Sequence, residues 1–127
     1  ICLGMQALFA ASEESPGTEG LGLLQGSITK IPPSDELKIP HMGWNSLVVN
    51  SGSRLMKGIS QQSYVYFIHS YYLQAESMDI VAASTDYGVT LHAAVEAGSV
   101  FGCQFHPEKS GETGLAILTN FIDLESV

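Results

Sequence analysis

Residues 64–72 read Tyr-Val-Tyr-Phe-Ile-His-Ser-Tyr-Tyr, a run that is dense in aromatic and β-branched side chains. Such residues favour β-structure, so this run predicts a strand through the middle of the chain. Alternating apolar residues predict further strands on either side of it, over residues 23–31, 46–49, 80–85, 90–97 and 99–105. Ala97-Gly98, between the last two strands, is typical of a hairpin turn.

Helices are predicted at the two ends of this run of strands. Apolar residues at helical spacing predict a helix over residues 3–12, and a stripe of Leu115, Leu118 and Ile122 predicts another over residues 111–124. Polar or irregular composition predicts loops and turns over residues 12–22, 32–36, 39–45 and 51–60. A helix, a series of strands and a closing helix together predict an α/β fold.

The composition limits the class of protein. The chain has 127 residues, 45% of them hydrophobic and 14% charged, which suits one domain with a real core. Its net charge of −8 argues against nucleic acid or an anionic membrane surface as a partner. Two cysteines 101 positions apart form no disulfide framework and are typical of a reduced, cytosolic compartment. No secretory signal and no apolar run long enough to span a bilayer is found.

Two short motifs carry reactive side chains. Residues 2–6 read Cys-Leu-Gly-Met-Gln, and residues 104–111 read Gln-Phe-His-Pro-Glu-Lys-Ser-Gly. They supply a thiol, an imidazole and a carboxylate, the groups that nucleophilic acyl transfer uses. A helix that begins at residue 2 or 3 would place Cys2 at its positive end, where the thiolate is favoured. The N–H of Leu3 would then be the natural donor to an oxyanion.

The second motif predicts a base and its orienting group. His106 and Glu108 flank Pro107 directly after a predicted strand, and residues at i and i+2 of extended backbone project to the same side. Glu108 could therefore orient His106, and His106 could deprotonate a nearby thiol. The residues alone leave another interpretation open, in which Cys2 is a buried inert thiol and His106 is a loop histidine beside a solvated Glu108.

Taken together, the motifs resemble those of the class I (triad-type) glutamine amidotransferases. Two further runs narrow the resemblance: Pro-His-Met-Gly-Trp-Asn at residues 40–45 and Tyr-Phe-Ile-His-Ser-Tyr at residues 66–71. With residues 2–6 and 106–111, they are similar to the HisH branch of the family, the glutaminase subunits of imidazole glycerol phosphate synthases. The resemblance runs along the whole chain. It implies an α/β, flavodoxin-like mixed sheet with flanking helices.

The resemblance also implies roles for individual residues. Cys2 would attack glutamine, His106 would be the base, and Glu108 would hold the imidazole. Substrate would be bound by the Leu3 N–H, Gln6 and the backbone of Ser70 and Tyr71. The surface toward the partner, a (β/α)8-barrel cyclase subunit that receives ammonia for histidine biosynthesis, would carry Met42, Trp44, Asn45 and Lys109. For Trp44, interface and core are both open. We expect no cofactor, and we expect no metal because Cys2, Cys103 and His106 do not have the spacing of a zinc site.

The chain departs from the family at its first residues. Family members are longer, and Ile1 is not a methionine, so we expect residues 1–127 to be the C-terminal portion of a single amidotransferase domain. The absent part would supply the first strands and helices, the strand before Cys2 and a second oxyanion donor. We therefore expect these residues alone to be inactive and poorly folded.

Three other functions remain as alternatives. The chain could be the glutaminase domain of another class I amidotransferase, although residues 40–45 and 106–111 weigh against this. It could be a non-catalytic interaction domain, with no use for Cys2. A papain-like protease is disfavoured, because the expected Asn-bearing context is missing and Glu108 lies only two residues from His106. Cys103, inside a predicted strand, is expected to be buried and inert.

Overall fold

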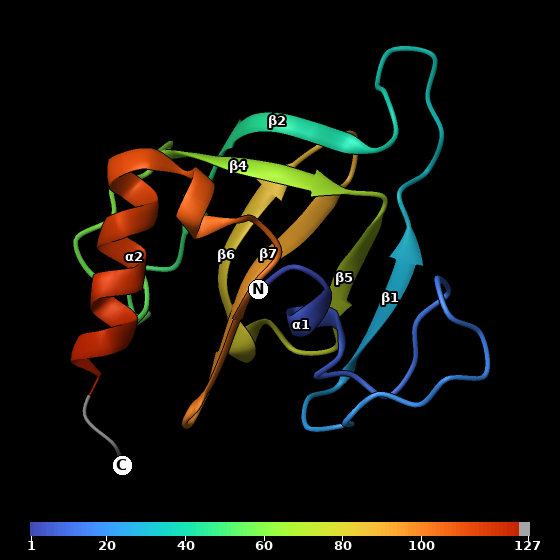
Figure 1. Ribbon diagram of the computed structural model, residues 1–127, viewed down its shortest axis with the longest axis horizontal. Coiled ribbons are helices and arrows are strands. Elements are labelled where there is room, and N and C mark those ends of the chain that lie inside the picture. The colour runs from blue at the N-terminus through green and yellow to red at the C-terminus, as the bar shows by residue number, and fades with distance from the viewer. Residues whose placement is uncertain (125–127) are drawn as a thin grey trace.

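Eight strands and two α-helices follow one another along residues 1–124, the part of the chain that the computed structural model describes (Figure 1). The strands are β1 (Gly26–Lys30), β2 (His41–Ser46), β3 (Val48–Val49), β4 (Tyr64–His69), β5 (Tyr71–Ala75), β6 (Val81–Asp86), β7 (Thr90–Ala97) and β8 (Val100–Cys103). The helices are α1 (Leu3–Gln6) and α2 (Gly111–Asp123), with 3-10 turns η1 (Met78–Ile80) and η2 (Pro107–Lys109). The predicted α/β fold class is confirmed.

The predicted central strand over residues 64–72 divides at Ser70. Before the break, β4 pairs antiparallel with β2, and after it β5 pairs antiparallel with β1. The carbonyl of Ser70 accepts a hydrogen bond from the N–H of Ile31 at 2.9 Å, which fixes the corner between the two ladders. One continuous apolar run in the sequence therefore serves two different sheets.

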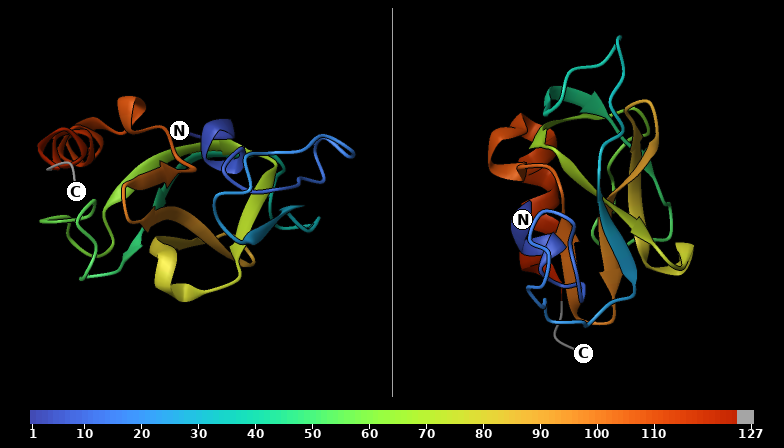
Figure 2. Two further views of the ribbon diagram at one scale, coloured as in Figure 1. Left: turned by 90° about the horizontal axis from the view of Figure 1, so that it is seen from below. Right: turned by 90° about the vertical axis from the view of Figure 1, so that its right-hand side faces the viewer.

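A four-stranded antiparallel sheet has the strand order β3-β6-β7-β8. The hairpin between β7 and β8 turns at Gly98, whose φ of 59° is easily adopted by glycine, so the predicted hairpin is confirmed. The strands curve around a shared interior (Figure 2). Its largest hydrophobic cluster includes Val65 and Phe67 of β4, Ala93 of β7 and Ile117 of α2.

The first helix is shorter than predicted. Apolar spacing predicts a helix over residues 3–12, but α1 ends at Gln6. The loop at residues 20–24 donates hydrogen bonds to carbonyls that a longer helix would use. The N–H of Leu21 donates to the carbonyl of Ala7, and the N–H of Leu23 donates to the carbonyl of Leu8. Long-range backbone pairing therefore replaces the last helical turns.

The predicted irregular segment over residues 39–45 is wrong, because it contains strand β2. Each residue from His41 to Ser46 pairs with a residue of β4. Gly43 in this strand has a φ of 124°, a conformation that few other residues adopt. The irregular backbone that the composition suggested is thus overridden by pairing with the aromatic strand β4.

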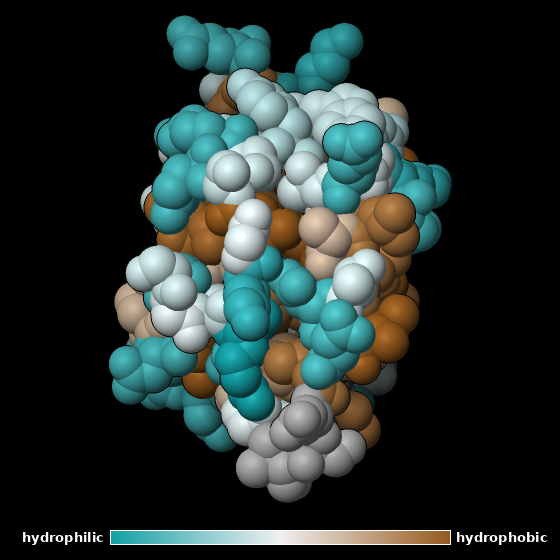
Figure 3. Space-filling view, turned by 90° about the vertical axis from the view of Figure 1, so that its left-hand side faces the viewer, coloured by the Kyte–Doolittle hydropathy of each residue, from teal (hydrophilic) through white to brown (hydrophobic). Residues whose placement is uncertain are grey.

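The closing helix lies where it was predicted but buries a different face. Leu115 and Ile122 of the predicted stripe are 65% and 78% exposed, whereas Gly114 and Ile117 are buried. A Cβ at Gly114 would lie 1.9 Å from the carbonyl oxygen of Pro107, so glycine lets α2 approach η2. Hydrophobic surface shows between the polar side chains on this face of the molecule (Figure 3).

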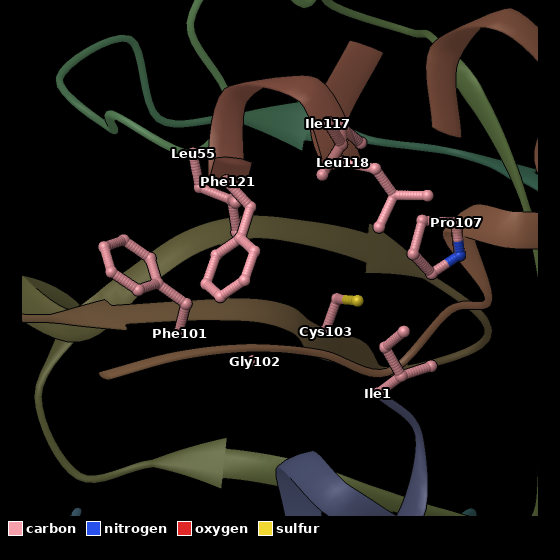
Figure 4. A pocket seen from close by; sticks show the side chains of 9 residues that line it. All are labelled: Ile1, Leu55, Phe101, Gly102, Cys103, Pro107, Ile117, Leu118 and Phe121. Carbon is pink, nitrogen blue, oxygen red and sulfur yellow. The ribbon is translucent and has the colours of Figure 1, made fainter. Parts of the chain in front are cut away.

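An apolar groove of about 210 Å³ lies between α2 and β8. Side chains of Phe101, Phe121 and Leu118 point into it, and Cys103 and Ile1 close one end (Figure 4). No helix within residues 1–124 is long and apolar enough to cross a membrane.

Candidate active site

Cys2 lies on a sharp turn in front of α1. Its φ of 53° is a left-handed conformation that costs a non-glycine residue about 1–3 kcal/mol. Its N–H donates to the carbonyl of Cys103 at 2.7 Å, which ties the turn to the edge of β8. The predicted placement of Cys2 at the start of a helix is confirmed, although the helix is one turn long.

Two hydrogen-bond partners of the Cys2 sulfur lie within residues 1–124. The thiol lies 3.9 Å from the carbonyl oxygen of Ile68, and the side-chain amide of Gln104 donates to Sγ at 3.5 Å. The N–H of Leu3 donates no hydrogen bond within residues 1–124. The thiol is thus held at the end of β4, beside a backbone donor that is not used internally.

His106 is hydrogen-bonded to strand β4, which also contacts Cys2. Its N–H donates to the carbonyl of Tyr66 at 2.9 Å, and its own carbonyl accepts from the hydroxyl of Ser110 at 2.6 Å. Tyr66 and Ile68 are two residues apart on β4, so the carbonyls that anchor His106 and Cys2 lie roughly 7 Å apart on one side of the strand. His106 is not among the hydrogen-bond partners of Cys2 Sγ in the described residues.

Glu108 contacts His106 as the sequence predicts. Its Oε1 lies 2.6 Å from Nδ1 of His106. Burial alone would raise the pKa of Glu108, but hydrogen bonds from its own backbone N–H and from His106, with the charge of Lys109, lower the pKa below its ordinary value. The predicted extended geometry is wrong: Pro107 opens the 3-10 turn η2, and this turn brings the two side chains together.

Gln6 is buried with both amide hydrogens committed inside the protein. Its Nε2 donates to the carbonyl of Tyr71 at 3.0 Å and to Oε1 of Gln104 at 2.9 Å. The motif at residues 104–111 contains Gln104 but predicts no role for it. Its position directly before Phe105-His106, at the end of a predicted strand, could have indicated a buried polar side chain. Such a side chain needs a hydrogen-bond partner inside the protein.

Ser70 and Tyr71 form the corner between β4 and β5, next to Gln6. The carbonyl of Tyr71 accepts from Gln6 and from Nδ1 of His69, the latter at 2.8 Å. The structure therefore brings Cys2, Gln6 and this corner to one place, and the carbonyls of Ser70 and Tyr71 are used inside the protein.

The four predicted interface residues do not all lie on one face. Met42 and Trp44 are 58% and 56% exposed on β2, and Lys109 is exposed on η2. Asn45 lies on the opposite face of β2, where its amide donates to the carbonyl of Asp86 at 2.9 Å. For Trp44, the exposed position replaces the core alternative.

Cys103 is buried as predicted. Burial raises the pKa of its thiol to about 12, and the thiol lies 3.5 Å from the carbonyl oxygen of Phe105. A thiol that stays protonated is a poor nucleophile, so Cys103 is inert at neutral pH.

Known proteins share both the sequence and the fold of this chain. The HisH subunit of imidazole glycerol phosphate synthase from Methanothermobacter thermautotrophicus is 50% identical over 124 residues, which are 98% of this chain and 61% of the relative. The HisH subunit from Deinococcus radiodurans is 49% identical over 121 residues, 95% of this chain and 56% of the relative. The chain thus spans about 60% of the length of these curated relatives.

Two solved structures share the fold at low sequence identity. The glutaminase domain of Trypanosoma brucei CTPS with bound acivicin has a TM-score of 0.65 at 18% identity, over 99% of this chain and 60% of that one. A putative GMP synthase protein from Thermoplasma acidophilum has a TM-score of 0.59 at 24% identity, over 76% and 47%. The family model for glutamine amidotransferase class-I matches residues 1–124. The chain belongs to the class I glutamine amidotransferase family.

Proposed function

We propose that the protein carrying this sequence is the glutaminase subunit of an imidazole glycerol phosphate synthase, with Cys2, His106 and Glu108 as its catalytic triad. The observation that carries the proposal is the attachment of Cys2 and His106 to neighbouring carbonyls of β4, with Glu108 2.6 Å from His106. The 49–50% identity to HisH subunits selects this branch of the family.

In the first half of the reaction, a thioester forms. His106 takes the proton of Cys2, and the thiolate attacks the side-chain amide carbon of glutamine. The Leu3 N–H, which has no internal acceptor within residues 1–124, donates to the resulting oxyanion. The C–N bond breaks as His106 returns the proton to the departing nitrogen, and ammonia leaves. Glu108 holds Nδ1 of His106 throughout and stabilises the imidazolium.

In the second half, water hydrolyses the thioester. His106 removes a proton from water, and hydroxide adds to the acyl carbon. The C–S bond then breaks, glutamate leaves, and His106 returns its proton to the sulfur of Cys2. Both amide hydrogens of Gln6 are used inside the protein, which leaves Oε1 as the one side-chain group that it could offer to substrate. Its predicted binding role therefore reduces to accepting a hydrogen bond, for which the substrate ammonium is a suitable donor.

The ammonia passes to a partner, which we propose is a (β/α)8-barrel cyclase subunit in a cytoplasmic heterodimer. Met42, Trp44 and Ile68 form an exposed apolar patch, here called the docking face. Met42 and Ile68 are direct cross-strand partners on the β2–β4 ladder. Exposed Trp and Met residues on a rigid ladder are typical of interface cores, and Lys109 supplies a charge on the neighbouring turn η2.

The proposal is tested by glutamine hydrolysis in the complete natural protein with its cyclase subunit. Cys2→Ala abolishes ammonia release, and Cys103→Ala, the matched control, leaves most of it, because the Cys103 thiol stays protonated. Ammonia release that survives Cys2→Ala, or that is lost only with Cys103→Ala, would overturn the assignment of the nucleophile.

A further inference from the structure

Two histidines that the proposed triad does not use are buried beside it. His41 of β2 and His69 of β4 are register partners, 3% and 7% exposed. Nδ1 of His41 lies 3.0 Å from Nε2 of His69. The ring of His41 is stacked between Phe67 and Tyr87, with centroid distances of 4.6 and 3.9 Å, so its plane is fixed.

The surrounding groups determine which nitrogen of each ring carries hydrogen. Nδ1 of His69 faces the Tyr71 carbonyl at 2.8 Å, an acceptor only, so it is protonated. Burial lowers the pKa of both histidines, so the rings are neutral and Nε2 of His69 is an acceptor. Nδ1 of His41 must therefore donate to it.

The other end of this pair is closed by Asn45. Nε2 of His41, left as an acceptor, lies 3.3 Å from Nδ2 of Asn45. The second amide hydrogen of Asn45 goes to the carbonyl of Asp86. The hydrogen bonds from Asn45 through His41 and His69 to the Tyr71 carbonyl are here called the series. Each donor in it has one acceptor, and all of its hydrogen bonds run in the direction from Asn45 to Tyr71.

The series continues from Tyr71 to the sulfur of Cys2. The Tyr71 carbonyl has two lone pairs, and His69 and Gln6 occupy both. The second amide hydrogen of Gln6 goes to Oε1 of Gln104, which forces the NH₂ of Gln104 toward Cys2 Sγ. The opposite orientation of the Gln104 amide would place its NH₂ against the NH₂ of Gln6 and its oxygen against the sulfur.

We propose that His41 and His69 are positioning residues: as neutral Nδ1–H tautomers, they fix the Tyr71 carbonyl and, through Gln6, turn the amide donor of Gln104 toward the Cys2 thiolate. The inference rests on the proposed function only in that Cys2 is the nucleophile. A hydrogen bond from an amide to a developing thiolate is charge-assisted, so it stabilises the reactive form of Cys2.

The direct test is the tautomeric state of the two rings in the complete natural protein. Long-range ¹H–¹⁵N NMR at pH 7 is expected to show hydrogen on Nδ1 and none on Nε2 for both His41 and His69. Hydrogen on Nε2 of either ring, or an imidazolium at pH 7, would overturn the proposal.

The second test follows Cys2 without glutamine. The rate of Cys2 alkylation by iodoacetamide is expected to fall about tenfold in His69→Phe and in Gln6→Met, since each interrupts the series at a different place. His69→Asn restores a donor to Tyr71 and recovers part of the rate. The matched control is His92→Asn, because His92 is half-buried outside the series and accepts from the N–H of Ala75.

The outcomes separate this inference from the proposed function. Alkylation rates of His69→Phe and Gln6→Met within twofold of the parent protein would overturn the positioning role. If these rates fall as expected while the parent protein releases no ammonia from glutamine, the positioning role stands and the proposed function fails. Gln6→Met keeps the test decisive if His69→Phe does not fold.

Discussion

The two faces of the β2–β4 ladder differ in exposure and polarity although both are built from the same two strands. The outward side chains Met42, Trp44 and Ile68 are exposed and apolar, and they form the docking face. The inward side chains include His41, Phe67 and His69, all at most 7% exposed. Because successive residues of a strand point to opposite faces, two short strands supply both surfaces.

The two faces are proposed to serve different purposes: partner binding on the docking face, and the positioning of the Cys2 thiol on the inner face. The docking face is exposed within residues 1–124, and it is the surface that we propose binds the partner. The inner face carries the hydrogen bonds that end at Cys2, and it belongs to the main hydrophobic core through Phe67. Changes on the inner face should therefore alter stability and thiol chemistry, and changes on the docking face should alter association only.

The largest expected difference between the faces is in folding stability. Phe67→Ala removes a fully buried ring that contacts His41 and Phe105, so it should lower the free energy of unfolding by about 3–5 kcal/mol. Trp44→Ala removes a ring that is 56% exposed and should change it by less than about 1 kcal/mol. Urea denaturation followed by circular dichroism measures both. Equal losses in the two variants would erase the distinction.

The inner face should also make stability depend on pH. Burial, and then the neighbouring His69, lower the pKa of His41 from 6.5 to about 4. Between these values the unfolded chain binds more protons than the folded one, so stability falls as the pH drops from 6.5 to 4. The full effect below pH 4 is about 3 kcal/mol, and above pH 6.5 the contribution is constant.

The matched comparison for this titration is His41→Gln, measured alongside the parent protein at each pH. The amide keeps a donor and an acceptor but does not titrate in this range. The groups around His41 are His69, whose pKa burial also lowers, Asn45, and the rings of Phe67 and Tyr87. If the free energies of unfolding of parent and variant change in parallel between pH 6.5 and 4, the pH dependence does not come from His41.

On the docking face, Trp44→Ala should weaken binding of the cyclase subunit. A buried Trp at the centre of an interface is worth about 2 kcal/mol, which corresponds to a roughly thirtyfold rise in Kd. Isothermal titration calorimetry measures it. Leu115→Ala, an equally exposed apolar change on α2, is the control and should leave Kd unchanged. An equal rise in Kd in both variants would contradict the placement of Trp44 in the interface.

The smallest expected effect is at the edge of the docking face. Lys109 is exposed on η2, and a charge at the rim of an interface affects the association rate more than the affinity. Lys109→Ala should change the binding free energy by about 0.5 kcal/mol and reduce the salt dependence of the association rate. Stopped-flow association at two ionic strengths measures this, and an unchanged salt dependence would exclude Lys109.

Sequence patterns predicted most of the strands better than they predicted the first helix and the segment before the central strand. Residues 90–97 form β7 with the predicted bounds, because a hairpin of alternating residues is specified locally. The helix over residues 3–12 and the irregular segment over 39–45 were wrong, because distant partners decided them: the loop at residues 20–24 for the first and β4 for the second. Propensity contains no information about such partners.

The candidate site shows the same division. The motifs predicted roles for Cys2, His106, Glu108 and Gln6. In the structure, His106 contacts Glu108, and Gln6 donates to Tyr71 and Gln104. Gln104 and the His41–His69 pair could not be assigned, because their roles depend on which nitrogen or oxygen meets which partner across two sheets. The inward direction of Asn45 likewise follows from strand pairing, not from its neighbour Trp44.

The most direct test of Cys2 as the nucleophile is the location of the acyl group during turnover. The complete natural protein, with its cyclase subunit, is mixed with glutamine, quenched in acid within the first turnover and mapped by peptide mass spectrometry. A glutamyl thioester is expected on Cys2 and none on Cys103, and no thioester is expected in His106→Ala, because His106 takes the proton of Cys2 before the thiolate attacks. A glutamyl group on Cys103, or glutamine hydrolysis at the parent rate in Cys2→Ala, would contradict Cys2 as the nucleophile.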